Sequence, residues 1–202
     1  MDAELSVEGG FADPVVSAQR VFRALMDAMA RPGAPREIVT DTEPPAPLTR
    51  ELAAVALTLA DHDTPVWLAP QLAASAAVVA WLRFHTGAPI VADPATADFA
   101  LAADLSALPP FHRLAQGTDE YPDRSTTLVL ALPGLMDGAA LRVTGPGIKG
   151  EAMIAPLGLS GDFIAQWAEN RTHFPRGIDL MLVADGQVIG LPRTTRIAGK
   201  EA

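Results

Sequence analysis

The residue types best suited to chemistry gather in a short polar turn, Asp61-His62-Asp63-Thr64, between two apolar stretches of this 202-residue chain. The carboxylates and the imidazole of this turn could act as acid and base or bind a ligand. Adjacent turn residues point in different directions, however, and their spacing matches no established metal-ligand pattern. Asp61 and His62 are therefore candidate ligand-binding residues. The alternative is a plain turn in which Asp61 accepts backbone amides and His62 is exposed.

A second imidazole, His85, stands at the end of a predicted helix, just before Thr86-Gly87. Its position beside the apolar segment makes it another candidate ligand-binding residue. The alternative has no function attached to it, because an imidazolium at a helix C-terminus also favours the helix dipole.

A glycine-rich loop over 145–150 follows a predicted strand and contains Lys149, one of only two lysines. Glycines let backbone amides approach an anion, and a lysine supplies the charge. The loop is not a Walker A motif, because no Ser or Thr follows Lys149 to hold magnesium. It is interpreted either as a phosphate cradle or as a tight turn between two elements.

Basic residues concentrate near the C-terminus of an otherwise acidic chain: Arg171, His173, Arg176, Arg193 and Arg196. Arginine forks suit phosphate-like oxygens, so Arg176 and Arg193 are candidates for an anion site, to which Lys149 could contribute. Protein interfaces are also enriched in arginine, and a surface that meets a partner is the alternative.

Composition excludes several classes of function. The formal net charge of −9 repels nucleic acid and anionic lipid. The absence of cysteine excludes disulfides, thiolate nucleophiles and zinc–thiolate sites. The acidic N-terminus lacks the basic and apolar regions of a signal peptide, and prolines interrupt the long uncharged run over 64–82. We therefore predict a cytoplasmic protein with no nucleic-acid partner, no membrane partner and no metal.

Apolar periodicity and capping residues predict alternating helices and strands. Helices are expected over 14–31, from residue 50 after a Thr49 cap, over 72–84, and from a Ser160 cap to residue 170. Strands are expected over 36–39, 65–69, 89–92, 99–102, 126–132 and 139–143. Asp185-Gly186 predicts a hairpin of 178–184 and 187–191.

This order of elements predicts an α/β fold, a three-layer α/β/α sandwich with a mixed sheet. The continuous apolar strand over 126–132 is expected to be buried on both faces. A single domain over 13–197 is expected, preceded by a flexible arm over 1–12 and followed by a tail over 198–202.

The first predicted helix combines an apolar stripe with a face rich in arginine. Asp27 can pair with Arg23 or Arg31, each four residues away. The stripe expected to face the core consists of Val15, Ala18, Phe22, Leu25 and Met29. The arginine face is richer than a solvated helix needs, so we predict that this helix serves assembly as well as packing.

Six segments together resemble the PhnH family of the bacterial carbon–phosphorus lyase machinery for phosphonate use. They are 22–33, 57–68, 83–89, 145–148, 174–180 and 192–195, and they follow the order and spacing of the family. The resemblance implies a fold similar to the large domain of fold-type-I pyridoxal-phosphate-dependent transferases, shortened and without that cofactor. No catalytic residue is established by motif for this subunit.

The resemblance also implies partners and a reaction. Family members form homodimers when isolated and join the G, I and J subunits in a core complex. With the G and I subunits, the family supports the ATP-dependent formation of ribose 1-phosphonate 5-triphosphate, and the J subunit cleaves the carbon–phosphorus bond. The expected role is structural or auxiliary, without activity alone. The alternative is a ligand-binding or catalytic subunit with its own phosphate or phosphonate site.

Overall fold

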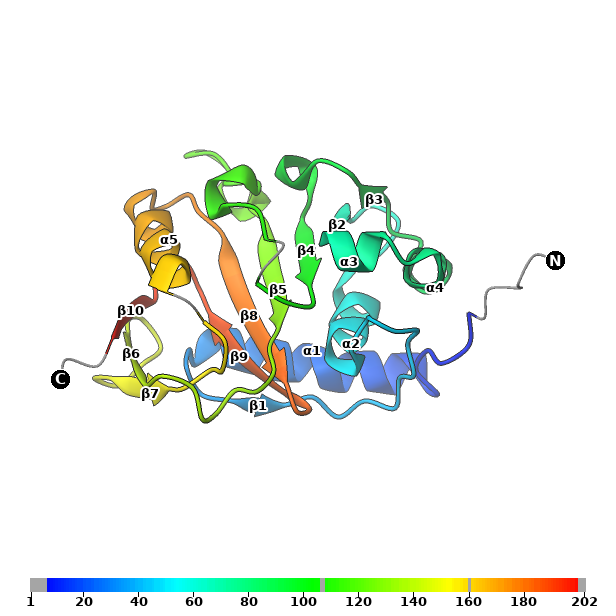
Figure 1. Cartoon of the computed structure of the whole chain (residues 1–202), viewed down its shortest axis with the longest axis horizontal. Helices are drawn as coiled ribbons and strands as arrows, with labels where there is room; N and C mark the ends of the chain where they lie inside the picture. Colours follow the sequence, from blue (N-terminus) through cyan, green and yellow to red (C-terminus); the bar gives the residue numbers. More distant parts are fainter. Residues whose placement is uncertain (1–6, 106–107, 160, 200–202) are drawn as a thin grey trace.

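The computed structural model describes residues 7–105, 108–159 and 161–199, which form an α/β fold around one mixed sheet (Figure 1). The sheet has seven strands in the order β1-β9-β8-β5-β4-β2-β3. In that order they span Arg36–Glu37, Gln187–Leu191, Asp179–Ala184, Thr127–Ala131, Phe99–Ala102, Val66–Leu68 and Ile90–Val91. Within this sheet only β9 runs against its neighbours, and the others are parallel. The predicted mixed sheet is confirmed.

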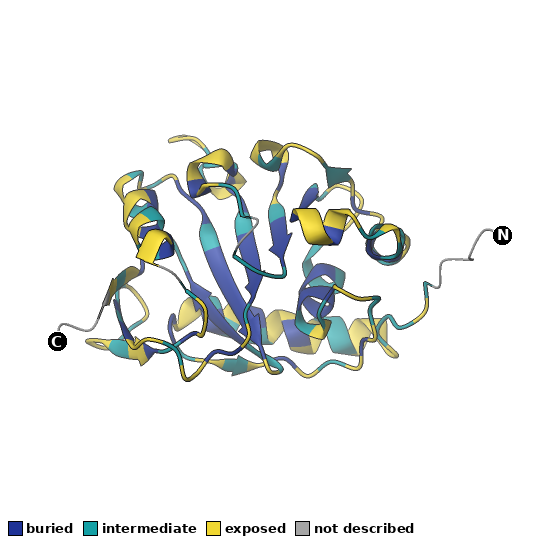
Figure 2. Cartoon of the chain, viewed as in Figure 1, coloured by how far each residue is buried: buried dark blue, intermediate teal, exposed yellow. Residues whose placement is uncertain are grey.

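Alternate residues of the central strands enter two separate cores. In β5, Leu128 and Leu130 pack on one side, whereas Val129 and Ala131 pack on the other. The second side is covered by α1 (Pro14–Ala30), α2 (Arg50–Leu59) and α4 (Ala76–Thr86). The first side is covered by α5 (Gly161–Thr172) and by a small second sheet. Figure 2 shows the resulting buried strands between more exposed layers, which confirms the predicted burial of β5 on both faces.

Two of the predicted helix starts are confirmed by their caps. The Asp13 side chain accepts a hydrogen bond from the backbone of Val16 at 3.1 Å, and Thr49 caps α2 in the same way. The third predicted cap, Ser160, lies outside the described residues. No helix in the described part of the chain is both long and apolar enough to cross a bilayer.

The helix predicted over 72–84 is two helices, α3 (Pro70–Ala73) and α4. The reason is Ser75, whose hydroxyl accepts the backbone N–H of Val78 at 3.3 Å and so begins a new helix. Helix α4 ends at Gly87, which adopts the left-handed conformation (φ 71°) that glycine tolerates best.

The apolar stripe predicted for the first helix is confirmed only in part: Leu25 is buried and Met29 packs against the core, but Val15 and Phe22 do not. Val15 is 67% exposed and Phe22 is 48% exposed, whereas Val21, Leu25 and Ala28 are buried. The buried row therefore lies further round the helix than the row that we predicted, and large apolar side chains are left on the outer face.

The cause of this rotation is a close contact between α1 and β9. A Cβ atom on Gly190 of β9 would lie only 2.6 Å from the carbonyl carbon of Ala28 and 2.8 Å from the backbone nitrogen of Met29. The missing side chain of Gly190 and the small side chain of Ala28 let the helix backbone lie directly against the strand. This packing turns the row containing Val21 and Leu25 toward the core.

The small sheet was only partly predicted. Its order is β10-β6-β7, with β10 at Arg196–Gly199, β6 at Leu141–Thr144 and β7 at Ala152–Ile154. The strand predicted over 139–143 is β6, which lies outside the main sheet. Strand β7 was not predicted, and β10 occupies the first part of the predicted tail over 198–202, because pairing with β6 orders it.

The predicted hairpin is confirmed. Strands β8 and β9 pair antiparallel around Asp185 and Gly186, whose φ angles of 51° and 69° fit a tight hairpin turn. The backbone N–H of Gly186 donates to the Glu51 carboxylate at 2.8 Å, so helix α2 also holds this turn.

Candidate functional site

The polar turn at 61–64 lies directly before β2, at the amino end of a parallel strand. The Thr64 hydroxyl donates to Asp61 Oδ1 at 2.7 Å, and the backbone N–H of Asp63 donates to the same oxygen at 3.0 Å. The bond from Thr64, with that from Asp63, lowers the pKa of the Asp61 carboxyl. His62 and Asp63 form an exposed pair at 3.2 Å. Open α/β sheets bind ligands outside the carboxyl ends of their strands, so this geometry favours a self-supported turn.

Replacing Asp61 with alanine is expected to lower the free energy of unfolding at neutral pH, with the loss shrinking in acid. Because the folded-state pKa is lowered, the stabilisation is complete above the usual value of 3.8 and disappears as the pH falls through the folded value. Urea unfolding of both proteins at several pH values measures this difference. The neighbouring Asp63→Ala variant keeps the hydrogen bonds to Asp61 and serves as the control. A pH-independent loss for Asp61→Ala would contradict the prediction.

His85 holds the N-terminal segment against α4. Its Nε2 atom lies 2.8 Å from the carbonyl oxygen of Val7, so Nε2 carries the hydrogen and donates it. One turn earlier on the helix, Trp81 Nε1 donates to the carbonyl of Glu8 at 2.7 Å. The His85 ring fills the space beside Gly10, where a Cβ would lie 2.5 Å from the ring. Residues 7–10 are thus bound to the domain, in contrast to the predicted flexible arm, and residues 1–6 lie outside the described part.

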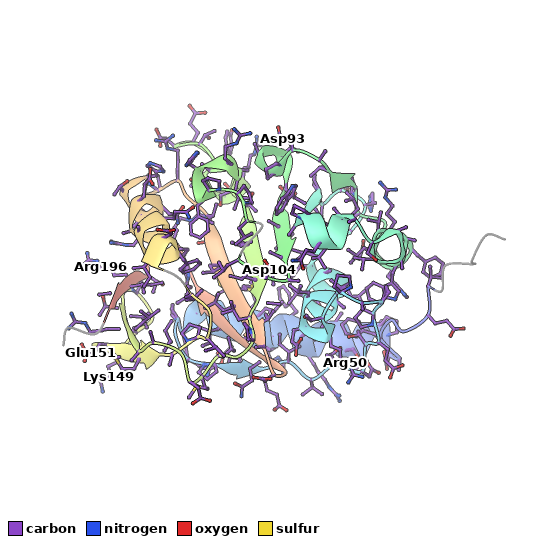
Figure 3. The ribbon with its side chains drawn as sticks, in the orientation of Figure 1. Arg50, Asp93, Asp104, Lys149, Glu151 and Arg196 are labelled. Carbon is purple, nitrogen blue, oxygen red and sulfur yellow. The ribbon has the colours of Figure 1, made fainter. Side chains whose placement is uncertain are left out.

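Lys149 lies in an exposed loop between β6 and β7. Figure 3 places it beside Glu151, on the outside of the molecule near the small sheet. The glycines of the loop allow close packing: a Cβ on Gly147 would meet Pro32 Cδ at 2.8 Å and would also clash with the Ala30 carbonyl at the end of α1. A helix C-terminus presents carbonyl oxygens, which repel anions. The geometry therefore favours the tight-turn interpretation.

Arg193 is engaged by the protein at every one of its side-chain donors. Its Nε and one Nη2 hydrogen go to the two carboxylate oxygens of Asp179. The other Nη2 hydrogen goes to the Ser125 hydroxyl at 2.6 Å, and Nη1 donates to the carbonyls of Pro122 at 2.7 Å and Pro175 at 3.2 Å. A guanidinium has five N–H donors, so none remains for an anion. This arrangement, which we name the Arg193 clamp, argues against an anion-binding role for Arg193.

Arg176 is next to the clamp in space but points elsewhere. Its Nε atom lies 3.1 Å from Asp119 Oδ1 in an exposed ion pair. Arg193 lines a hollow of about 360 Å³ together with Phe174 and Pro175, whereas Arg176 is not among its lining residues. Arg193 binds the carbonyl of Pro175, the residue before Arg176, but the two arginine side chains bind different protein groups. They therefore do not form a common anion site.

Three carboxylates lie at the same edge of the main sheet. Asp179 begins β8, Asp98 precedes β4, and the turn at Asp61 precedes β2, all at amino ends of parallel strands. Desolvation by burial raises the pKa of the Asp98 carboxyl. No group of three or more His, Asp or Glu side chains suited to a metal occurs among the described residues. At this edge Asp61 supports its own turn, and Asp179 binds Arg193 in the clamp.

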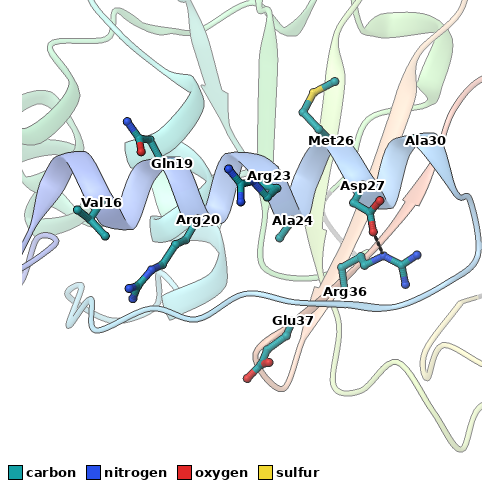
Figure 4. A pocket seen from close by; sticks show the side chains of 10 residues that line it. All are labelled: Val16, Gln19, Arg20, Arg23, Ala24, Met26, Asp27, Ala30, Arg36 and Glu37. Atoms are coloured by element: carbon teal, nitrogen blue, oxygen red, sulfur yellow. Dashed lines mark hydrogen bonds and ion pairs between the residues drawn. The ribbon is translucent and has the colours of Figure 1, made fainter.

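One hollow of the described surface was not predicted from the residue types of the sequence. It is a groove of about 910 Å³ along the outer face of α1, bounded by β1, and Figure 4 shows its lining. Its lining includes Val16, Arg20, Arg23, Met26 and Glu37. The arginine-rich face of this helix was the available signal. The apolar lining of the groove includes Val16, Ala24 and Met26, none of which belonged to the apolar stripe predicted for this helix.

Comparison with known proteins gives a consistent family. Residues 9–198 match the family model described as "Bacterial phosphonate metabolism protein (PhnH)". The chain is 52% identical over 189 residues to the "Alpha-D-ribose 1-methylphosphonate 5-triphosphate synthase subunit PhnH" of Rhizobium meliloti, covering 94% of each chain. It is 39% identical over 106 residues to the "Putative C-P lyase subunit protein HtxG" of Stutzerimonas stutzeri, covering 52% of this chain and 53% of that protein.

Proposed function

The chain belongs to the PhnH family of bacterial phosphonate metabolism proteins, and from this premise we propose that it is a subunit of a carbon–phosphorus lyase complex. In this role it supports the formation of ribose 1-phosphonate 5-triphosphate from ATP and a phosphonate. The observation that carries the proposal is the extent of the family match, which runs through both sheets and every described helix.

We further propose that the subunit is auxiliary and has no activity alone. Three of the candidate ligand-binding residues instead make their hydrogen bonds to other groups of the protein. Asp61 stabilises its own turn, His85 binds the N-terminal segment, and Arg193 has all five donors occupied. These contacts favour a structural role over an anion site of the subunit's own.

The proposed partners are the G, I and J subunits of the complex, and the proposed state of the isolated protein is a homodimer. The proposed relation to the large domain of fold-type-I transferases is supported by the single reversed strand, β9, in an otherwise parallel seven-stranded sheet. A transferase of that fold type binds pyridoxal phosphate through a Schiff-base lysine. Lys149, the one lysine among the described residues, is exposed in a loop that packs against the end of α1.

The purified protein alone is expected to release no adenine from ATP in the presence of methylphosphonate, because it supplies no catalytic site. Co-expression with the G and I subunits is expected to yield a complex that contains this chain and forms the triphosphate product, read out by phosphorus NMR. The same complex with this chain omitted is the control.

Two outcomes would contradict the proposal. Robust turnover by the isolated chain would show a catalytic subunit. Saturable heat on calorimetric titration of the isolated chain with ATP or methylphosphonate would favour the alternative, a phosphate or phosphonate site of its own.

A further inference from the structure

The outer face of α1 carries large apolar side chains that the fold does not cover. Val15, Phe22 and Met26 are 67%, 48% and 54% exposed, and they recur at helical spacing along one side of the helix. Leu25 and its neighbours on the opposite side are already buried in the core. A soluble helix normally has one apolar face, so the second apolar face indicates a surface that is covered in an assembly.

A groove runs beside this apolar row, and Met26 belongs to both surfaces. The groove of about 910 Å³ runs between α1 and the segment that begins with β1. In Figure 4, Arg20 and Glu37 lie on the side of that segment, whereas Gln19 and Met26 point to the opposite side of the helix. Grooves of this kind along a helix accept the apolar face of an amphipathic segment.

Two cations of the groove have no partner within the described part of the chain. Asp27, the nearest carboxylate on the helix, is engaged by Arg31 and Arg36. No ion pair or side-chain hydrogen bond of Arg20 or Arg23 occurs among the described residues. In a chain with a net charge of −9, these arginines create a local cationic surface beside apolar side chains. The complementary surface is apolar and carries carboxylates.

We infer that this groove binds an amphipathic segment of a different subunit, with apolar side chains flanked by Asp or Glu; this inference rests on the proposed subunit function. A second copy of the chain fits less well. Arg23 lies near the middle of the exposed face, so a two-fold axis through the helix would bring Arg23 of both copies together. Like charges placed together in an interface oppose association, whereas carboxylates of a different subunit pair with these arginines.

The test uses the full chain and the G, I and J subunits, with affinity measured by surface plasmon resonance at low and high salt. The double variant Arg20→Glu/Arg23→Glu is expected to bind on the order of 100-fold more weakly, because attraction becomes repulsion. Its fold is expected to be unchanged, because neither arginine has a partner within the described chain. Wild-type binding is expected to weaken as salt increases.

The control variant Arg83→Glu/Arg113→Glu makes the same change in net charge at exposed sites outside the groove and is expected to bind like the wild type. A second variant, Met26→Gln, removes apolar contact without changing charge and is expected to weaken binding as well. Equal affinity of the groove variants and the control would overturn the inference alone. Absence of wild-type binding to all three subunits would overturn both the inference and the proposed function. Loss of self-association in the groove variants, with subunit binding intact, would assign the groove to a second copy instead.

Discussion

Replacing Arg193 with alanine is expected to destabilise the protein by about 3–5 kcal/mol, because it leaves a poorly accessible carboxylate without its partner. The side chains of Arg193 and Asp179 are only 13% and 18% exposed. The substitution also removes the donors to Ser125 and to the carbonyls of Pro122 and Pro175. The measurement is the free energy of unfolding from urea titration.

The matched control for this prediction is Arg176→Ala. Arg176 is the other arginine that was a candidate for the anion site, but its ion pair with Asp119 is exposed, so a loss of less than about 1 kcal/mol is expected. A double variant, Asp179→Leu/Arg193→Met, is expected to lose less stability than the sum of the two single losses, because no unpaired charge remains. Equal stability of Arg193→Ala and the wild type would show that the clamp is not structural.

Replacing Gly190 with alanine is expected to destabilise the protein by about 1–3 kcal/mol through overpacking. The added Cβ would meet backbone atoms of Ala28 and Met29 in α1, which cannot move away as a flexible side-chain tip can. The helix must shift outward, and the groove on its outer face shifts with it. Thermal or urea unfolding measures the loss of stability, and binding of the partner subunits measures the displacement of the groove.

Gly161→Ala is the control for Gly190→Ala. Gly161 is the first residue of α5, and an added Cβ there meets nothing within 4 Å. A change within about 0.5 kcal/mol is expected, as for other surface substitutions. If Gly190→Ala were as stable as this control, the direct packing of α1 on β9 would be incorrect.

The parts of the fold that follow local rules could be predicted from the sequence. The hairpin depends on two residues, Asp185 and Gly186, that tolerate positive φ angles. The caps Asp13 and Thr49 act within their own first helical turns. The buried strand β5 is continuously apolar because both of its faces meet a core. In each case the signal that allows the prediction lies within a few consecutive residues.

The parts that depend on distant contacts could not be predicted. The buried row of α1 is set by Gly190, which lies far along the chain. The role of Arg193 depends on carbonyl oxygens of Pro122 and Pro175, and backbone carbonyls carry no signal in the sequence. From the sequence alone, Arg193 therefore resembles a residue that binds a phosphate-like ligand. Its role becomes clear only when the carbonyl groups that it contacts are known.

The dependence of α1 on β9 has a consequence for the order of events during synthesis. Helix α1 is among the first elements to leave the ribosome, whereas β9, which fixes its position, is among the last. Among the described strands, β1 also pairs only with β9, with Arg36 opposite Val188. The groove between α1 and β1 is therefore complete only after nearly the whole chain has been made. A partner that recognises this groove selects finished, folded chains and does not bind nascent ones.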